Sequence, residues 1–404
     1  MKKFVVAHPA QQHSYKIAEA LIEKEMLFKY ITSVYLKKGS ILNKLLNIIP
    51  GENKLRAKGR HSDKICDEEV LLINEFSGLL LLILQRVKFL KHLYKKYWDF
   101  HNKKFNKKLI KYINSNIDEI SGVIVFDQVS FDFFKKKINI PIILDMSAPS
   151  VVFMKSQFEK YGISTLKYDA LLKKNNFEIN SADFFIGASS ITERSLLNMG
   201  IEKKQIKIFP YGVNIVKEND KLMNLRTRKK RLKFLFVGRV TLEKGIGVLD
   251  SFFEKFGIED AWTFAGDYSD SKKFYEKYED KVQFVGHVSK IKMFELYRDN
   301  DVLVFPSLAD GFGLAVIEAL SNGMYVICSD STGAKDIIME GKNGDVFLTG
   351  DENDLNNKIQ YYKKNINKID RLKIKETVND LTWERYNKNI IKSLEYFTVG
   401  MNNE

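Results

Sequence analysis

Two cationic side chains stand at the end of one apolar run in the second half of the sequence. Arg239 directly follows the run Lys233–Gly238, and Lys244 comes five residues later, where a helical pattern begins. Parallel strands bind ligands beyond their carboxyl ends, so two cations at such an end predict a site for an anion. The chemistry indicated is the binding of a phosphate or diphosphate group.

A pair of acids with glycines beside it follows a later apolar run. Asp310 and Glu318 are separated by seven residues. Gly311 and Gly313 would let a ligand approach the backbone closely, and a helix starting near Leu314 would offer free N–H groups to an anion. Glu318, one turn into that helix, is placed to accept hydrogen bonds from paired ribose hydroxyls. Together with the two cations, this pattern predicts a nucleotide diphosphate site.

Further strand ends in the second half would lie at the same edge. Gly266 ends one run, and His287 and Val288 follow another. Asp299, Asn300 and Asp301 have the spacing of a metal motif, but they stand where a strand begins, away from this edge. We therefore expect Gly266, His287 and Val288 to contact the nucleotide, and we expect no bound metal.

The elements that must position these residues are short apolar runs, each followed by a helical pattern. Runs that are apolar throughout, without alternation, are typical of strands buried on both faces of a parallel sheet. Strands alternating with helices predict α/β layers. The runs are Phe4–Ala7, Gly122–Asp127, Ile140–Asp145, Asp183–Ala188, Gln205–Phe209, Lys233–Gly238, Trp262–Gly266, Val282–Gly286, Val302–Pro306 and Tyr325–Ser329.

Three segments depart from this alternation. Residues 36–115 suggest a helical insertion in the first half, and Tyr15–Leu27 suggests one helix after the first run. Asn214–Arg231 is polar and charged with no apolar run, so it is the best candidate for a linker between two doubly wound halves.

The second half resembles the nucleotide-sugar domain of the retaining GT-B glycosyltransferases of the group 1, or family 4, type. The resemblance is strong over about residues 180–350 and weak toward the N-terminus. The matching motifs are Val237-Gly238-Arg239, Glu243-Lys244-Gly245, Phe284-Val285-Gly286-His287-Val288, Phe305-Pro306-Ser307, Asp310-Gly311-Phe312-Gly313, Glu318-Ala319, Gly333-Ala334 and Gly341-Lys342-Asn343-Gly344.

The resemblance implies a fold and roles for these residues. The fold is GT-B, two Rossmann-like doubly wound domains with a cleft between them. Arg239 and Lys244 would neutralise the leaving diphosphate, and Glu318 would hold the ribose. Asp310 stands where the family usually has Glu, and would face the donor sugar. The residues that complete the expected donor-sugar contact are Gly311, Phe312, Gly313 and Leu314.

Candidate acceptor-side residues follow runs of the first half. Gln12 and His13 lie in the loop after the first run, and Asp127 and Asp145 each end a buried-type run. Strand-end carboxylates facing a cleft are natural site residues. Turn and cap roles are the alternative for the two acids, and His13 would equally precede or cap the following helix.

The domain boundaries expected from these patterns are residues 1–213 for an acceptor-side domain and 214–384 for a nucleotide-sugar domain. A C-terminal helix, 385–404, would pack back on the first domain. The resemblance implies no cofactor, because the nucleotide sugar is a substrate.

The expected reaction transfers a sugar from a nucleotide diphosphate sugar, with a UDP-sugar as the first expectation, to a hydroxyl of a glycan or lipid-linked acceptor. The anomeric configuration would be retained, and the expected setting is cell-surface polysaccharide synthesis. A sugar-nucleotide 2-epimerase on the same fold and a non-catalytic nucleotide-sugar-binding protein are the alternatives.

The 404-residue chain has a formal net charge of +14. Between Arg86 and Lys111 stand ten basic residues against one acid, Asp99, with aromatic and apolar residues interleaved. A basic amphipathic helix is typical of an anionic membrane surface, and it is equally typical of a solvated helix face. Nucleic acid is disfavoured because the sequence has no motif for binding it.

Targeting and redox patterns predict a cytoplasmic protein, on its own or bound to the inner face of the membrane. Cys66 and Cys328 lie far apart and form no disulfide framework, which fits a reducing compartment. The apolar run Phe4–Ala7 is too short for a signal peptide. The stretch Leu79–Leu84 is too short to cross a bilayer.

Overall fold

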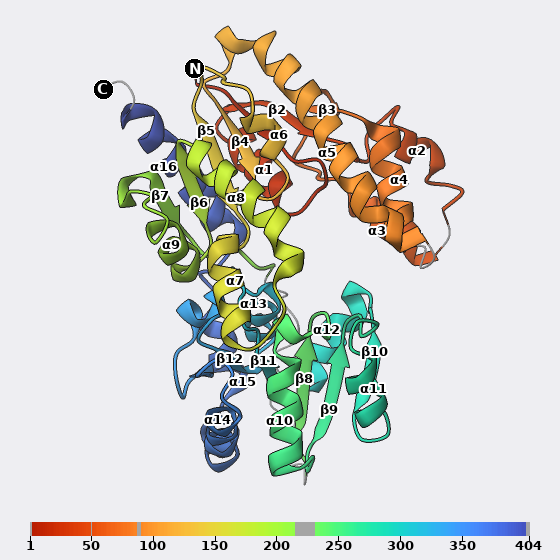
Figure 1. The fold of residues 1–404 in the computed structure, drawn as a ribbon, viewed down its shortest axis with the longest axis vertical. Coiled ribbons are helices and arrows are strands. Elements are labelled where there is room, and N and C mark those ends of the chain that lie inside the picture. Colours follow the sequence, from red (N-terminus) through yellow and green to blue (C-terminus); the bar gives the residue numbers. More distant parts are fainter. Residues whose placement is uncertain (1, 50, 87–89, 215–230, 401–404) are drawn as a thin grey trace.

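The computed structural model describes residues 2–49, 51–86, 90–214 and 231–400. They form two halves, each built on one β-sheet with helices on its faces (Figure 1). The first sheet has seven strands in the order β3-β2-β1-β4-β5-β6-β7, and the second has six in the order β10-β9-β8-β11-β12-β13. Each described pairing is parallel. The predicted α/β class, with two doubly wound sheets, is thereby confirmed.

The central strands are buried at every position because both faces of each sheet are covered. The burial extends from end to end in β1, β4, β5, β11 and β12, which explains their non-alternating sequences. The strands are β1 (Phe4–Ala7), β2 (Leu27–Thr32), β3 (Val70–Leu72), β4 (Gly122–Phe126), β5 (Ile142–Met146), β6 (Phe184–Gly187), β7 (Ile206–Ile208), β8 (Lys233–Val237), β9 (Ala261–Ala265), β10 (Gln283–Gly286), β11 (Val302–Phe305), β12 (Tyr325–Ser329) and β13 (Gly344–Phe347).

The helices alternate with the strands in both halves. Those of the first half are α1 (Ser14–Ile22), α2 (Ile41–Leu45), α3 (Gly51–Lys58), α4 (Glu75–Arg86), α5 (Lys91–Asn114), α6 (Phe131–Phe134), α7 (Val151–Lys160), α8 (Asp169–Ser181) and α9 (Ser190–Leu197). Those that follow are α10 (Ile246–Phe256), α11 (Lys272–Tyr278), α12 (Lys290–Asp299), α13 (Leu314–Ser321), α14 (Glu352–Asn365), α15 (Arg371–Glu376) and α16 (Trp383–Gly400). Among the described helices, none is both long enough and apolar enough to cross a membrane.

Two expectations for the first half are wrong. The helix expected over Tyr15–Leu27 ends at Ile22, and Leu27 begins β2. The 36–115 segment is not purely helical, because Val70–Leu72 pair with β2 as the edge strand β3. A turn at Glu25, whose φ is +55°, separates α1 from β2 and allows the reversal.

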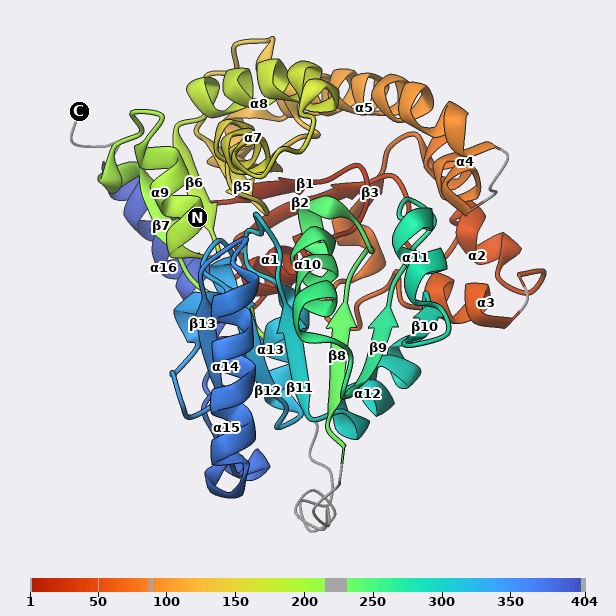
Figure 2. The same cartoon turned by 60° about the horizontal axis from the view of Figure 1, so that its bottom comes forward.

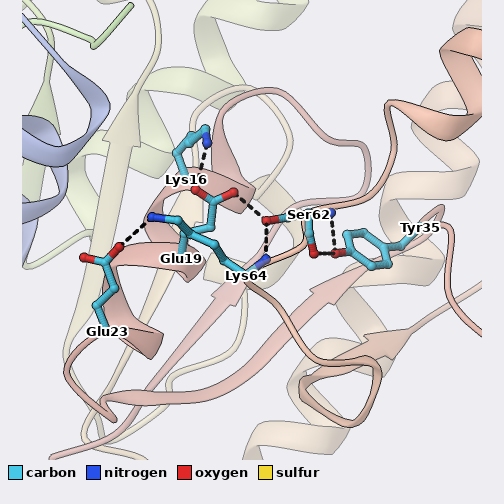
Figure 3. Close-up of polar contacts among 6 residues, drawn as sticks. All are labelled: Lys16, Glu19, Glu23, Tyr35, Ser62 and Lys64. Atoms are coloured by element: carbon cyan, nitrogen blue, oxygen red, sulfur yellow. Dashed lines mark hydrogen bonds and ion pairs between the residues drawn. The ribbon is translucent and has the colours of Figure 1, made fainter. Parts of the chain in front are cut away.

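A polar network fixes the 36–115 segment to α1 (Figure 3). Ser62 Oγ donates to the buried Glu19 carboxylate over 2.6 Å, and Lys16 Nζ donates to its other oxygen over 2.7 Å. The Ser62 backbone N–H donates to Tyr35 Oη over 2.8 Å, and Lys64 Nζ pairs with Glu23. These contacts hold the segment and α1 together as one unit.

The chain passes between the halves at two adjacent places. The Val213 N–H donates to the Leu381 carbonyl over 2.9 Å, and a Cβ on Gly212 would lie 2.3 Å from the backbone nitrogen of Trp383. Beyond Trp383, α16 returns to the first half, where the Phe397 ring stacks on Phe184 at 4.2 Å. Most of the predicted linker, residues 215–230, lies outside the described residues.

Each half contributes side chains to the core of the other. Phe158 of α7, in the first half, is buried in the cluster that surrounds the second sheet. Phe312 and Ile317, from the second half, are buried in a cluster on the first sheet. The Tyr161 hydroxyl, just after α7, donates to the Thr349 carbonyl.

Candidate active site

Three glycines close the carboxyl ends of β8, β9 and β10 against one another. The Gly238 N–H donates to the Ala265 carbonyl, and the Gly266 N–H donates to the Gly286 carbonyl over 2.8 Å. Gly266 has φ +149°, and a Cβ there would lie 1.8 Å from the Gly238 oxygen. The strand ends therefore present backbone without side chains, as the approach of a large anionic ligand requires.

Lys244 and Asp310 meet at this edge. Lys244 Nζ donates to Asp310 Oδ2 over 2.5 Å, although the two residues are 66 positions apart. Gly245, with φ +82°, lets the turn that carries Lys244 pack on the Pro306 carbonyl, from which a Cβ would be only 1.9 Å away. The Leu308 N–H donates to the Glu243 carbonyl and fixes the same turn. The sequence predicted both residues as site residues, and the structure brings them into contact.

Arg239 follows β8 and is exposed. Within the described part of the chain, no carboxylate forms an ion pair with it. The charge of Arg239 acts on the Tyr168 hydroxyl, where burial nevertheless raises the pKa to about 12. The guanidinium is therefore open to an incoming anion, whereas Lys244 already holds a carboxylate.

Glu318 lies one turn into α13. The helix begins after Gly313, its N-cap residue, whose φ of +79° lies in the left-handed region, and no side chain caps its first turn. The Tyr297 hydroxyl donates to Glu318 Oε2 over 2.9 Å. Desolvation by the surrounding protein raises the pKa of this carboxyl, although part of the residue is open to solvent, and the Tyr297 hydrogen bond opposes that rise. Such a carboxylate has an unoccupied oxygen for ligand hydroxyls.

The remaining donor-side residues have different surroundings. His287 is exposed, and Val288 is partly buried against the core of the second half. The Phe312 ring is buried and contacts Tyr211 at 5.4 Å, so only the Phe312 backbone N–H reaches the site, donating to Asp310 Oδ1. Leu314 is exposed. The strand order β10-β9-β8-β11 places His287, Gly266, Arg239 and Asp310 along one edge.

His13 and Asp145 form a hydrogen-bonded pair on the first half. His13 Nε2 lies 2.9 Å from Asp145 Oδ1, and the His13 side chain keeps 11% of its surface while that of Asp145 keeps 1%. The His13 ring packs between Phe126 and Tyr211, at 5.4 and 4.6 Å. In the tautomer in which the His13 Nε2–H donates to Asp145 Oδ1, the Nδ1 atom of His13 is left as a hydrogen-bond acceptor.

Asp127 is buried beside this pair. Its Oδ1 accepts from the backbone N–H and the hydroxyl of Ser147, over 3.0 and 2.8 Å, and Oδ2 accepts from the Gln128 amide. Burial raises the pKa of Asp127 to about 6, and the nearby Asp145 adds to the rise. Gln12 is exposed and adopts a φ of +38°. Asp127 therefore fixes the loop after β5, the turn role that the sequence left open.

The Asp127 pKa makes a prediction for stability. The native state binds this proton more tightly than the unfolded chain, so the contribution of Asp127 is greatest below pH about 4 and is lost as pH rises toward 6. The isosteric Asp127→Asn variant removes this loss. Relative to wild type, we expect its free energy of unfolding to rise by roughly 3 kcal/mol between pH 4 and 7, measured by denaturant unfolding of both proteins across that range. Parallel pH profiles for the two proteins would contradict the assignment.

Two residues near the pair were not singled out from the sequence. His8 is buried directly after β1, its Nδ1 accepts from the Ala10 N–H, and burial lowers its pKa to about 3. Tyr211 is buried against His13, and neighbouring acids act with burial to raise its pKa well above the usual value. His8 carries the same signal as Asp127, a polar residue at the end of a buried strand. Tyr211 stands just before the predicted linker, where no such signal exists.

The two candidate groups face one another across the boundary between the halves. The Ser189 hydroxyl, at the start of α9, donates to the Gly311 carbonyl over 2.5 Å. A Cβ on Gly311 would lie 2.5 Å from the Ser147 carbonyl oxygen. Tyr211 contacts both His13 and Phe312. The carboxyl edges of both sheets therefore meet at Asp310 and the His13–Asp145 pair.

Known proteins share parts of this architecture. Residues 218–377 match the family model described as "Glycosyl transferases group 1". The sulfoquinovosyl transferase SQD2 of Arabidopsis thaliana is 26% identical over 255 residues, which cover 59% of this chain and 48% of that protein. The chain thus spans about half the length of this curated relative.

Solved structures match over nearly the full length. The lipopolysaccharide outer core galactosyltransferase WaaB superposes with a TM-score of 0.62 at 17% identity, covering 98% of this chain and 99% of its own. Anabaena HepE, solved in complex with UDP-glucose, gives 0.62 at 14% identity, covering 98% and 100%. These likenesses show the fold. Residues 218–377 thus match the group 1 glycosyl transferase model, and the chain as a whole has the two-sheet GT-B fold.

Proposed function

We propose that this chain transfers a glycosyl group from a nucleotide diphosphate sugar, a UDP-sugar first among them, to a hydroxyl of a glycan or lipid-linked acceptor, with retention of configuration. The observation that carries the proposal is the Lys244–Asp310 contact, which sets a cation and an acid side by side at the carboxyl edge of the second sheet. Residues 214–384 would bind the donor, and residues 1–213 with 385–404 would bind the acceptor.

The donor would occupy the glycine-lined ends of β8, β9 and β10. Arg239 and Lys244 would hold the diphosphate, since ammonium and guanidinium groups neutralise the charge that develops as it leaves. Lys244 has three N–H donors and uses one of them on Asp310, so it can hold a phosphate oxygen at the same time. Glu318 would accept hydrogen bonds from the ribose, with Gly266, His287 and Val288 beside the nucleoside.

The donor sugar would lie between Asp310 and the start of α13, against Gly311, Gly313 and Leu314. On the opposite side, Nδ1 of His13 would accept a hydrogen bond from the acceptor hydroxyl, because His13 Nε2 is already hydrogen-bonded to Asp145. Asp127 would maintain the loop that carries Ser147. Polysaccharide assembly at the cell surface is the setting we propose, supported by the likeness to WaaB, which is named as a lipopolysaccharide galactosyltransferase.

A donor screen tests this function. Thermal shift with UDP-, GDP- and ADP-sugars should identify the base, followed by product analysis with and without glycan or lipid-linked acceptors. Glycoside formation that requires an acceptor and retains the anomeric configuration supports transfer. Conversion of the donor alone would assign a 2-epimerase instead, and binding with neither product would assign a non-catalytic protein.

The His13 role makes a separate prediction. His13→Gln removes the Nδ1 acceptor, and we expect kcat/KM for the acceptor to fall about 10²-fold while donor affinity is unchanged. His61→Gln is a matched control, because His61 also lies near an aspartate, Asp63 at 3.3 Å, but in the 36–115 segment. Equal losses in both variants would show that His13 acts only through packing.

A further inference from the structure

The positive charge of the chain is concentrated in one segment. Residues 36–115 contain 18 Lys and Arg against seven Asp and Glu, so they carry +11 of the net +14. Most of them form α2, α3, α4 and α5, which lie together along one rim of the first half (Figures 1 and 2). The same segment also contains the edge strand β3. The rest of the chain is nearly neutral, so a partner that responds to charge would meet this rim first.

The same segment exposes large apolar side chains. Phe76 is 72% exposed and Ile83 52%, and they stand two helical turns apart on one stripe of α4, with the half-buried Leu80 between them. Ile48 after α2 and Leu55 on α3 are 76% and 62% exposed. Further exposed apolar residues of the segment are Leu45, Leu93 and Phe100. A small cluster lies between α2, α3 and α4, with Val34, Leu42 and Ala57 as its buried members.

Helix α5 divides into two parts with different roles. Its C-terminal part packs on the first sheet through Phe105, Leu109 and Ile113, and its lysines there are exposed to solvent. The solvated-face interpretation therefore applies to this part of the predicted Arg86–Lys111 surface. The N-terminal part keeps Leu93 and Phe100 exposed beside Lys95 and Lys96. Residues 87–89 lie outside the described residues.

We infer that α2, α3, α4 and the N-terminal part of α5 form a docking surface for an anionic lipid bilayer. Lysines interleaved with exposed Phe, Ile and Leu suit a head-group layer of negative charge above acyl chains. A second copy of the chain is a poor occupant, because α2, α3, α4 and residues 91–100 contain eight Lys and Arg against three Asp and Glu, and two such surfaces of net charge +5 would repel each other.

The surface is joined to the candidate acceptor site. Gln11, in the loop before His13, donates from Nε2 to the Gly59 carbonyl at the end of α3 over 3.1 Å. The Glu19–Ser62 network fixes the same segment to α1, which begins directly after His13 (Figure 3). Docking would thus hold His13 at a set height above the bilayer, where a lipid-linked acceptor would present its sugar. This last consequence rests on the proposed function, whereas the docking itself does not.

Vesicle sedimentation of the full chain tests the proposal. Wild type should pellet with vesicles of phosphatidylglycerol and phosphatidylcholine in about 0.1 M salt, pellet weakly with phosphatidylcholine alone, and be largely released in about 1 M salt, where charges are screened within about 3 Å. Phe76→Ser with Ile83→Ser should lower the partition coefficient about tenfold or more. Lys95→Glu with Lys96→Glu should lower it comparably.

Matched controls on the second half separate this rim from a general effect. Leu348→Ser removes another exposed apolar side chain, and Lys364→Glu with Lys368→Glu reverses two exposed lysines. Both should bind vesicles as wild type does.

Absence of salt-sensitive binding by wild type, or equal losses in the controls, overturns the proposal. Binding to duplex DNA but not to vesicles, or a dimer that Phe76→Ser with Ile83→Ser dissociates, would also overturn it and assign the surface to that partner. Transfer to a water-soluble acceptor, measured in the same variants, reports separately on the proposed function.

Discussion

Lys244→Ala is expected to lower the rate of sugar transfer about 10²–10³-fold, the usual effect of removing one preorganised charged group from a transition state. The Nζ atom is the partner of Asp310 and, with Arg239, one of the two cations that would hold the leaving diphosphate in the proposed mode. The substitution removes only a side chain that is 27% exposed, so the fold should be retained. Steady-state transfer kinetics and circular dichroism on the purified variant measure both effects.

A matched lysine provides the control for this prediction. Lys255 on α10 also pairs with a carboxylate, Glu352 at 3.1 Å, but on the outer surface of the same half. Lys255→Ala should leave transfer unchanged, because exposed ion pairs contribute at most about 1 kcal/mol to stability. Wild-type rates in Lys244→Ala would remove this residue from the mechanism.

Asp310→Asn separates binding from chemistry at the same contact. The neutral amide no longer holds Lys244 by charge and no longer repels phosphate, so UDP should bind several-fold more tightly. Transfer should nevertheless fall about 10²-fold or more, because in the proposed mode the lost carboxylate is the one that faces the donor sugar. Calorimetric titration with UDP beside the transfer assay tests this split. Loss of both UDP affinity and transfer would indicate that Asp310 serves only the structure of the loop.

Gly311→Ala should have a comparable effect through a different cause. The added Cβ would lie 2.5 Å from the Ser147 oxygen and 2.9 Å from the Ala148 Cα, both backbone atoms of the other half. Backbone cannot move aside as a flexible side chain can, so the halves must separate locally. A displacement of about 1 Å between reacting groups can cost about 10²-fold in rate, while nucleotide binding by the second half should persist.

A second glycine tests whether crowding is the cause. Gly247 lies within α10, and a Cβ there would meet only the end of the Leu242 side chain, at 3.7 Å. Gly247→Ala should keep full activity and stabilise the helix by about 0.5–1 kcal/mol. If Gly311→Ala turned over as fast as wild type, the close approach of the halves would have no part in catalysis.

The sequence predicted ten of the thirteen described strands and missed β2, β3 and β13. Strand β13 contains Asp345, whose carboxylate accepts from the buried Tyr325 hydroxyl over 2.7 Å. That partner lies 20 residues away and leaves no local signal. Strand β2 continues an apolar pattern from α1, so the boundary between them depended on the turn at Glu25.

The candidate site was predictable residue by residue, but its contacts were not. The strand-end rule selected His13 and Asp145 separately, because each follows or ends a buried strand. Their hydrogen bond joins positions 132 residues apart, and only the order of strands in the first sheet brings them together. Similarly, the sequence predicted that Gly311 lets a ligand approach the backbone. In the structure, the backbone of Ser147 from the other half also approaches Gly311 closely.

The exchange of core residues between the halves has a practical consequence for engineering. Cutting the chain at the 214–231 junction would remove Phe158 from the fragment that contains the second sheet and would expose to water the core residues on which Phe158 packs. The complementary fragment would lose Phe312 and Ile317 in the same way. Chimeras that exchange the second half for that of another enzyme should therefore transfer residues 151–168 with it. The reason is that Phe158 of α7 packs in the core of the second half.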